Sequence, residues 1–223
     1  MDLTGKRVIV TGAAGVLGQA VAARCVALGA TVALLDIVEG FSSTLGDTRC
    51  VDLADTGAVE RCIAGIGDFD AVCNIAGGFD MGPGVHEIDD AHWDAMFDIN
   101  VTTLRNMLRA TLPRLVERGR GSVVNVGALG ALSGQAAMGA YTAAKSVVMR
   151  LTEAAAQEVR RKGVNVNAVL PSLIDTPRNR ADMPNANHAN WVSPENLANV
   201  ICFLASDAAV EVHGALIPVS GRV

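Results

Sequence analysis

Short apolar segments alternate with longer, helix-like segments along almost the whole chain. The first apolar segment, Arg7–Val10, leads into a glycine-rich turn, and each of the others is followed within two residues by Gly, Asp or Pro. Apolar runs of this length between turn residues predict buried strands. The predicted strands are residues 7–10, 31–35, 50–51, 71–75, 122–126, 164–170 and 216–219.

The segments between these strands carry helix patterns and helix-boundary signals. Gly29 stops the first helix, and Ser193-Pro194 provides an N-cap and a first-turn proline for the last one. Because proline lacks an N–H donor, we expect the longest helix to be bent or interrupted near Pro113. The predicted helices are residues 15–28, 55–66, 89–118, 139–162 and 194–205.

Two segments show no helical or strand periodicity. Residues 37–49 carry Gly, Ser and Thr and are expected to form a loop or a reduced helix. Residues 175–190 are polar and rich in Asn, which is typical of a loop, and we expect a substrate lid over about 175–192.

Strands that alternate with helices predict right-handed βαβ units and an α/β fold. We expect one domain over residues 1–223, with a doubly wound parallel sheet of about seven strands in a three-layer αβα arrangement. Helices on both faces explain why the strands are apolar throughout. A flavodoxin-like domain without dinucleotide chemistry has the same pattern, so the motifs must decide between the two.

Composition excludes several classes of function. Half of the residues are hydrophobic, yet no apolar run approaches the ~20 residues of a membrane helix. The net charge is −5 and no basic face is visible, which argues against nucleic-acid binding. Five scattered cysteines and four isolated histidines give neither a disulfide framework nor a metal-ligand pattern. Without a visible secretory signal, we expect a soluble, cytoplasmic protein with a small-molecule substrate and no metal.

A glycine-rich segment, Thr11–Gly18, follows the first strand and opens the first helix. Gly12, Gly15 and Gly18 are three residues apart. Glycines at this spacing permit a tight turn and let backbone N–H groups reach a pyrophosphate at the helix N-terminus. Because the strand before it and the helix after it both fit, the segment predicts dinucleotide binding.

Asp36, at the end of the second strand, bears on the choice of dinucleotide. A carboxylate at this position can accept hydrogen bonds from the ribose hydroxyls and would repel a 2′-phosphate, and no arginine follows it, which favours NAD(H) over NADP(H). The alternative is that Asp36 only caps a loop. Asp52, after the third strand, is either an adenine contact or a solvated turn residue.

Tyr141 and Lys145 are four residues apart on a predicted helix and therefore share a face. A cation about 4 Å from the phenol contributes roughly 4 kcal/mol at an effective dielectric of about 20. This is on the order of three pKa units, so we expect Lys145 to lower the pKa of Tyr141 from about 10 towards neutrality. Tyr141 is the only tyrosine in the chain and follows a strand expected to border the cleft, which argues against a surface pair.

In combination, these motifs resemble the short-chain dehydrogenases/reductases, and the resemblance covers essentially the whole chain. The motifs appear in the order found in that family: Thr11–Gly18, Asn74-Ile75-Ala76-Gly77, Asn100, Tyr141-x-x-x-Lys145 and Pro171-x-x-x-Asp175-Thr176-Pro177.

The resemblance implies a Rossmann-type fold and a hydride-transfer reaction. Tyr141 would donate or accept the proton, Lys145 would bind the ribose and lower the tyrosine pKa, and Asn100 would hold a proton-relay water. The helices at 89–118 and 139–162 pair across subunits in the family, which implies a homodimer or homotetramer. The expected cofactor contacts are Gly12, Ala14, Gly15, Val16, Leu17, Gly18, Asp36, Asp52, Leu53, Asn74, Ala76, Gly77, Tyr141, Lys145, Pro171, Ile174 and Thr176, the last two of them near the nicotinamide amide.

Two positions depart from the family pattern. Ala128 stands thirteen residues before the tyrosine, where family members usually have a serine that donates a hydrogen bond to the substrate oxygen. Val16 stands where the family commonly has its middle glycine. These departures, the short stretch after Asp36 and the motif from Pro171 to Trp191 resemble the dihydropteridine reductase branch.

The missing serine bears on the substrate. Loss of one donor to a developing oxyanion can cost about 10²–10³ in rate, so an electron-poor quinonoid or conjugated acceptor is favoured. Ser133 is a weaker candidate for a group that reaches the cleft. The leading hypothesis is an NAD(H)-dependent reductase of a C=N or C=O bond, with quinonoid dihydropterin as its sharpest form. The alternatives are a general ketone reductase or alcohol dehydrogenase, and a catalytically idle dinucleotide-binding sensor.

Overall fold

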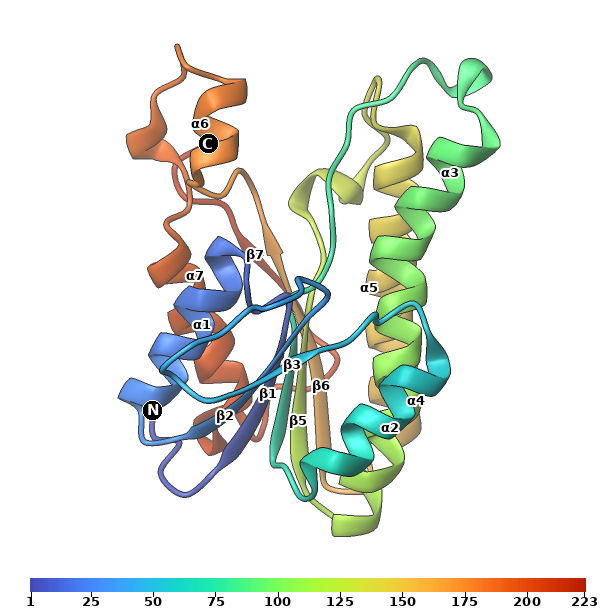
Figure 1. The fold of residues 1–223 in the computed structure, drawn as a ribbon. Helices are drawn as coiled ribbons and strands as arrows, with labels where there is room; N and C mark the ends of the chain where they lie inside the picture. Colours follow the sequence, from blue (N-terminus) through green and yellow to red (C-terminus); the bar gives the residue numbers. More distant parts are fainter.

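The computed structural model describes residues 1–223 and contains a single seven-stranded parallel sheet (Figure 1). The strand order is β3-β2-β1-β4-β5-β6-β7, and every neighbouring pair is parallel. This confirms the doubly wound parallel sheet. The strands are β1 (Arg7–Thr11), β2 (Thr31–Asp36), β3 (Asp47–Cys50), β4 (Ala71–Asn74), β5 (Gly121–Val126), β6 (Val164–Pro171) and β7 (Leu216–Val219).

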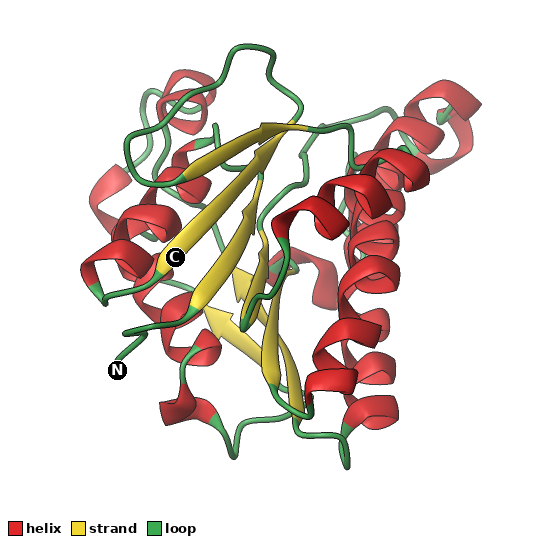
Figure 2. Ribbon diagram, turned by 60° about the horizontal axis from the view of Figure 1, so that its bottom comes forward, coloured by secondary structure: helices red, strands yellow, loops and turns green.

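Helices cover both faces of the sheet and form a three-layer arrangement (Figures 1 and 2). On one face lie α1 (Val16–Ala27) and α7 (Pro194–Ala205). On the other lie α2 (Thr56–Ile66), α4 (Thr103–Arg118) and α5 (Gly139–Val159).

The sheet divides the core into two apolar layers. Val8 and Val10 of β1 belong to the layer under α1 and α7, whereas Ile9 belongs to the layer under α4 and α5. Successive strand side chains point to opposite faces, so a strand covered on both sides must be apolar at every position. This is the physical reason for the uninterrupted apolar runs in the sequence.

The strand order reverses between β1 and β4, and the loops after these strands meet at the carboxyl edge of the sheet. Gly12 follows β1 with a φ of 62°, and a Cβ added there would lie 2.8 Å from the backbone nitrogen of Ala76, after β4. Open α/β sheets bind ligands at such a reversal point. The fold therefore brings the glycine-rich turn and the Asn74–Gly77 motif together.

The long helix predicted at 89–118 is interrupted, but not at Pro113. The structure has α3 (Asp90–Phe97), a π-helical turn at Asp98–Thr102, and α4, which continues through the exposed Pro113. The Asn100 side-chain amide donates to the carbonyl of Met96, 3.0 Å away, and so takes part in the helical ladder. Side chains that insert into this ladder, as well as prolines, disrupt helices.

Most other boundaries agree with the sequence prediction to within one residue, and the larger differences are in three places. The third strand is β3 at 47–50 rather than 50–51, and the helix predicted to end at 162 stops at Val159. The segment at 175–192 is not entirely loop, because it contains the short helix α6 (Pro177–Asp182), capped by the Thr176 hydroxyl, and a 3₁₀ turn at His188–Asn190. A polar helix of only six residues shows no apolar periodicity, so the sequence pattern does not predict it.

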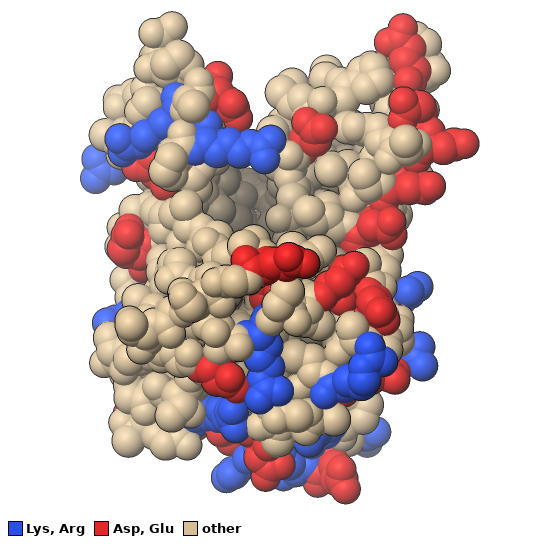
Figure 3. Space-filling view, in the orientation of Figure 1, with Lys and Arg blue, Asp and Glu red and all other residues tan.

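The surface is hollowed above the carboxyl ends of the strands (Figure 3). The segment that contains α6 stands on one side of this hollow, and the chain that leads from β4 to α3 stands on the other (Figure 1). Basic side chains are visible on the α6 side, and acidic side chains gather on the α3 side (Figure 3).

Gly12→Ala is expected to lower the free energy of unfolding by more than Gly5→Ala. Both glycines have positive φ, 62° and 73°, so each alanine incurs about 1–2 kcal/mol of left-handed strain. Only the Cβ at position 12 also meets backbone atoms, because nothing lies within 4 Å of a Cβ at Gly5. Urea unfolding at neutral pH measures both losses, and equal losses would contradict the close approach to Ala76.

Candidate active site

Thr11 fixes the loop that follows β4. Its buried hydroxyl accepts hydrogen bonds from the backbone N–H groups of Ile75 and Ala76, each at 3.0 Å. Thr11 belongs to the predicted glycine-rich motif but is not among the predicted site residues. A polar side chain at the end of an otherwise apolar strand was the one feature of the sequence that could have indicated its role.

The first turn of α1 has backbone N–H groups without a side-chain cap. The N-cap residue Gly15 cannot provide a side-chain hydrogen bond, and no acidic residue lies in the first turn. Gly18 packs so closely that an added Cβ would collide with the Gly12 carbonyl oxygen. Val16, which stands where the family commonly has its middle glycine, is 43% exposed at the start of the helix. Free N–H groups at a helix N-terminus are suited to an anion such as a pyrophosphate.

The Asp36 carboxylate caps backbone groups on two loops. It accepts hydrogen bonds from the N–H of Ala14 at 2.8 Å and from the N–H of Val38 at 3.1 Å. Because a carboxylate oxygen can accept more than one hydrogen bond, these contacts leave room for a ribose hydroxyl. Asp36 therefore ties the glycine-rich turn to the end of β2, and its expected ribose contact stays a prediction.

Asp52 and Leu53 follow β3 at the same edge. The Asp52 carboxylate accepts a hydrogen bond from the N–H of Ala54, as in a local turn, and is exposed. Leu53 is buried, and its carbonyl accepts from the side chain of Asn106 on α4 at 2.9 Å. The turn contact does not exclude the expected adenine contact of Asp52, which stays a prediction.

Asn74 begins a buried polar network. It donates to the Oδ1 atom of Asn125, which in turn donates to the hydroxyl of Thr152, both at 2.9 Å. The Oδ1 atom of Asn74 has no protein partner. Asn74 lines a small polar cavity, together with Asn100 and Lys145, with room for about one water-sized molecule.

Asn100 clamps the loop after β4. Its Oδ1 accepts from the N–H of Gly78 and its Nδ2 donates to the carbonyl of the same residue, both at 3.1 Å. A Cβ on the preceding Gly77 would lie 2.9 Å from this Oδ1 and 3.1 Å from the Nζ of Lys145. The Gly77 backbone thus passes between Asn100 and Lys145, and these three predicted site residues are brought together.

Burial dominates the electrostatics of Tyr141 and Lys145. Lys145 is 6% exposed, and its ammonium donates to the carbonyl of Val126 at 3.0 Å. Burial lowers the pKa of Lys145 to about 8 and raises the pKa of Tyr141 to about 12. The expectation that the ammonium would lower the tyrosine pKa is therefore wrong for this state, because desolvation outweighs any attraction between the two groups.

The surroundings of the Tyr141 ring are apolar. The ring packs against a cluster formed by Ala128, Ala131, Met149 and Leu170. On another side it meets the ring of Phe79 edge to face, with centroids 4.9 Å apart. Phe79 is not among the predicted site residues, because no local pattern predicts a contact between residues so far apart in the chain.

Whether Ser133 reaches the cleft stays a prediction. Ser133 is exposed, and its hydroxyl accepts a hydrogen bond from Gln135 on the same loop at 3.4 Å. Ala128 itself is buried, so a methyl group occupies the position of the family's serine side chain.

The lid residues are held by local contacts. Pro171 ends β6 and is buried. The carbonyl of Ile174 accepts from the side chain of Asn179 at 2.8 Å, and the Thr176 hydroxyl accepts from the N–H of the same residue at 3.2 Å. The proposed nicotinamide contacts of Ile174 and Thr176 stay predictions.

No cluster of three or more His, Cys, Asp or Glu side chains could hold a metal ion. All five cysteines are free thiols. None of the helices is both long enough and apolar enough to cross a membrane.

Comparisons with known proteins agree with this geometry. A family model described as short chain dehydrogenase matches residues 6–187. The chain is 34% identical over 187 residues to sorbitol dehydrogenase from Cereibacter sphaeroides, covering 78% of this chain and 73% of that protein. It is 33% identical over 235 residues to cis-4-hydroxycyclohexanecarboxylate dehydrogenase from Sinomonas cyclohexanicum, covering 96% and 94%.

Among solved structures, a proposed 2-deoxy-D-gluconate 3-dehydrogenase from Agrobacterium tumefaciens with bound NADP is similar over 99% of this chain and 96% of that one. The TM-score is 0.88 and the sequences are 31% identical. The seven-stranded sheet, the family match and these relatives show that the chain belongs to the short-chain dehydrogenase/reductase family. Members of this family are oxidoreductases that transfer a hydride between a nicotinamide dinucleotide and a hydroxyl or keto substrate.

Proposed function

We propose that the protein is an NADH-dependent reductase of a conjugated C=O or C=N bond, with Tyr141 as proton donor. The observation that carries this proposal is the combination of a desolvated Tyr141 and a buried Lys145 with an apolar residue, Ala128, in place of a second hydrogen-bond donor. A substrate beside Tyr141 would meet its hydroxyl and the apolar cluster around Ala128.

The residues at the carboxyl edge fit a nicotinamide dinucleotide. The uncapped first turn of α1 would hold the pyrophosphate, Asp36 would accept from the adenosine ribose, and Lys145 would donate to the other ribose. A side chain at Gly77 would fill the space between Asn100 and Lys145, so the backbone there can be approached closely. The nicotinamide, when bound, supplies or accepts the hydride.

The site residues divide the proton chemistry between them. Tyr141 would give its proton to the substrate and become a phenolate, and the ammonium of Lys145, four residues along α5, would offset that negative charge. With its pKa of about 8, Lys145 is the group of the pair that titrates near neutral pH. Asn100, clamped on Gly78, would keep the loop in place and hold a water for proton return.

The preference for NADH rests on Asp36. Its carboxylate is fixed by Ala14 and Val38, so a 2′-phosphate nearby would meet a negative charge that cannot turn away. The related structure with bound NADP belongs to another protein and does not bear on the carboxylate at this position.

The substrate proposal favours electron-poor acceptors. A developing oxyanion without a second donor is costly, whereas a conjugated acceptor spreads the charge itself. Quinonoid dihydropterin, the substrate implied by the resemblance to the dihydropteridine reductase branch, meets this condition. A second candidate function is a general alcohol dehydrogenase, which the names of the sorbitol and hydroxycyclohexanecarboxylate relatives favour.

Initial rates of NADH and NADPH oxidation test the proposed function. We expect wild-type protein to prefer NADH and to reduce quinonoid dihydropterin or an aryl ketone faster than a saturated ketone. Tyr141→Phe should retain NADH binding and lose about 10²-fold or more in turnover, since general acid catalysis contributes roughly 10²–10⁴. Faster oxidation of a saturated alcohol with NAD⁺ than reduction of any conjugated acceptor would favour the second candidate. NADH binding without turnover on any substrate would favour a sensor.

Lys145→Met should abolish turnover and yet raise the free energy of unfolding at pH 7. The fall in the pKa of Lys145 from 10.5 to about 8 corresponds to about 3 kcal/mol of destabilisation while the buried group is charged. Between pH 8 and 10.5 the folded wild type loses this proton and the unfolded chain keeps it, so the advantage of the variant should shrink as pH rises.

Urea unfolding at pH 7 and at higher pH measures this difference. The exposed Lys162 provides the control, because Lys162→Met should show no comparable pH dependence. A Lys145→Met protein that is less stable than wild type at pH 7 would contradict the cost of the buried charge.

A further inference from the structure

The Phe79 ring is large, apolar and 40% exposed, although it lies against the proposed proton donor. Its contact with Tyr141 is edge to face, at an interplanar angle of 89°. In this arrangement the Tyr141 ring covers one side of Phe79, and the rest of the Phe79 ring is exposed to solvent. Aromatic pairs prefer this geometry, and it fixes the relative orientation of the two rings.

The backbone around Phe79 is anchored on both sides. Before it, both the N–H and the carbonyl of Gly78 are bonded to the side chain of Asn100. After it, the N–H of Gly82 donates to the carbonyl of Ala137, just ahead of α5, at 2.9 Å. The loop is thus tied to the two helical segments that carry the proposed catalytic groups, and Phe79 is presented at a defined place.

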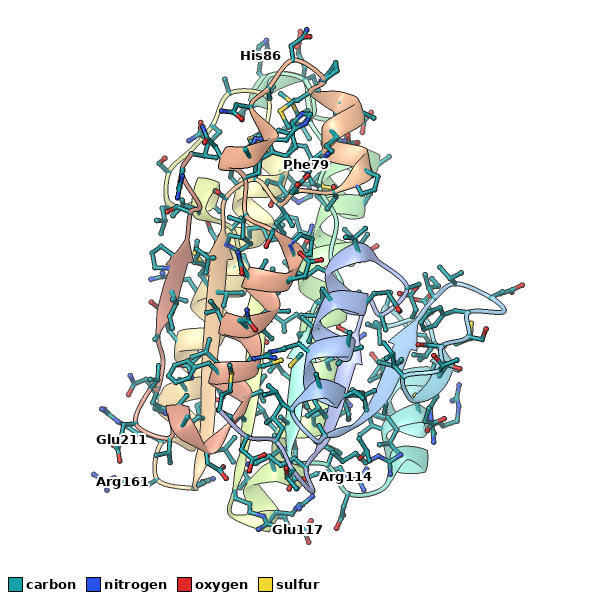
Figure 4. The ribbon with its side chains drawn as sticks, turned by 90° about the vertical axis from the view of Figure 1, so that its left-hand side faces the viewer. Phe79, His86, Arg114, Glu117, Arg161 and Glu211 are labelled. Carbon is teal, nitrogen blue, oxygen red and sulfur yellow. The ribbon has the colours of Figure 1, made fainter.

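Phe79 lies on the loop after β4, at the end of the molecule that is hollowed. The loop after β4 rises beside the hollow, opposite the segment that contains α6 (Figures 1 and 3). Figure 4 shows Phe79 at the end of the molecule that carries this segment, whereas Arg114 and Glu117 lie at the other end. The exposed part of Phe79 is therefore at the same end of the sheet as the proposed substrate.

From this placement we propose that Phe79 is a specificity-determining residue, whose exposed ring contacts the substrate and selects a flat, unsaturated group attached to the reacting C=O or C=N bond. The inference rests on the proposed function and deepens it. The cluster around Ala128 that packs against Tyr141 is apolar, so beside the reacting bond we expect ring contacts rather than hydrogen bonds to select the substrate. Saturated rings of similar size lack the flat face and the π-system that such contacts require.

Acetophenone and cyclohexyl methyl ketone form a matched pair of substrates for the test, since they differ only in the flatness and unsaturation of the ring. Wild type should have the higher kcat/KM for acetophenone. Phe79→Leu keeps an apolar side chain and should lower the acetophenone-to-cyclohexyl ratio by roughly three- to tenfold, which is the range of aromatic pair contacts. Met81→Ala, on the same loop and 58% exposed, is the control and should leave the ratio unchanged.

A binding measurement separates failure of this proposal from failure of the proposed function. With NAD⁺ present no hydride can be donated to a ketone, so calorimetric titration of the two ketones into this complex reports contact alone. Weaker binding of acetophenone to Phe79→Leu, with unchanged binding of the cyclohexyl ketone, supports the role of Phe79 even if no substrate is turned over. An unchanged ratio in both the kinetic and the binding measurements would overturn the proposal.

Discussion

Burial of the Lys145 ammonium beneath the loop that follows β4 is the constraint on which the site depends. The charge is removed from water and is given one protein acceptor, the carbonyl of Val126. Burial of a cation with only one acceptor destabilises the folded state. The fold tolerates this cost because the packed core around the sheet and α5 offsets it. The lowered pKa of Lys145 and the close approach of Gly77 are both consequences of this placement.

The fold accounts for this arrangement through the reversal of strand order at β1 and β4. The turn after β1, the loop after β4 and the first turns of α5 reach the same edge of the sheet from separate parts of the chain. Thr11 joins the first two with hydrogen bonds, and Asn100 joins the loop to the π-helical turn. The polar side chains of Thr11 and Asn100 are thus held in place by hydrogen bonds to the backbone of the loop after β4.

Local patterns were enough to predict the order of strands and helices, the glycine-rich turn and the place of Tyr141 and Lys145 on one helix. Contacts across the chain were not predictable in this way. The direction of the Tyr141 pKa depends on burial by side chains from other segments. The clamp between the Asn100 side chain and Gly78 joins residues that are 22 positions apart in the chain, and the carboxylate of Asp36 accepts a hydrogen bond from the N–H of Ala14 on another loop. Helix propensity and motif spacing contain no information on these distances.

The central claim is that Tyr141 is the proton donor beside the nicotinamide, so its pKa must fall when the positive charge of NAD⁺ is bound next to it. Because it is the only tyrosine in the chain, the ultraviolet absorbance of the phenolate reports its ionisation directly. Without dinucleotide, the phenolate should form with a pKa of about 12. With NAD⁺ bound, the added positive charge should move the titration to clearly lower pH. A phenol that titrates at the same pH with and without NAD⁺ would contradict the account.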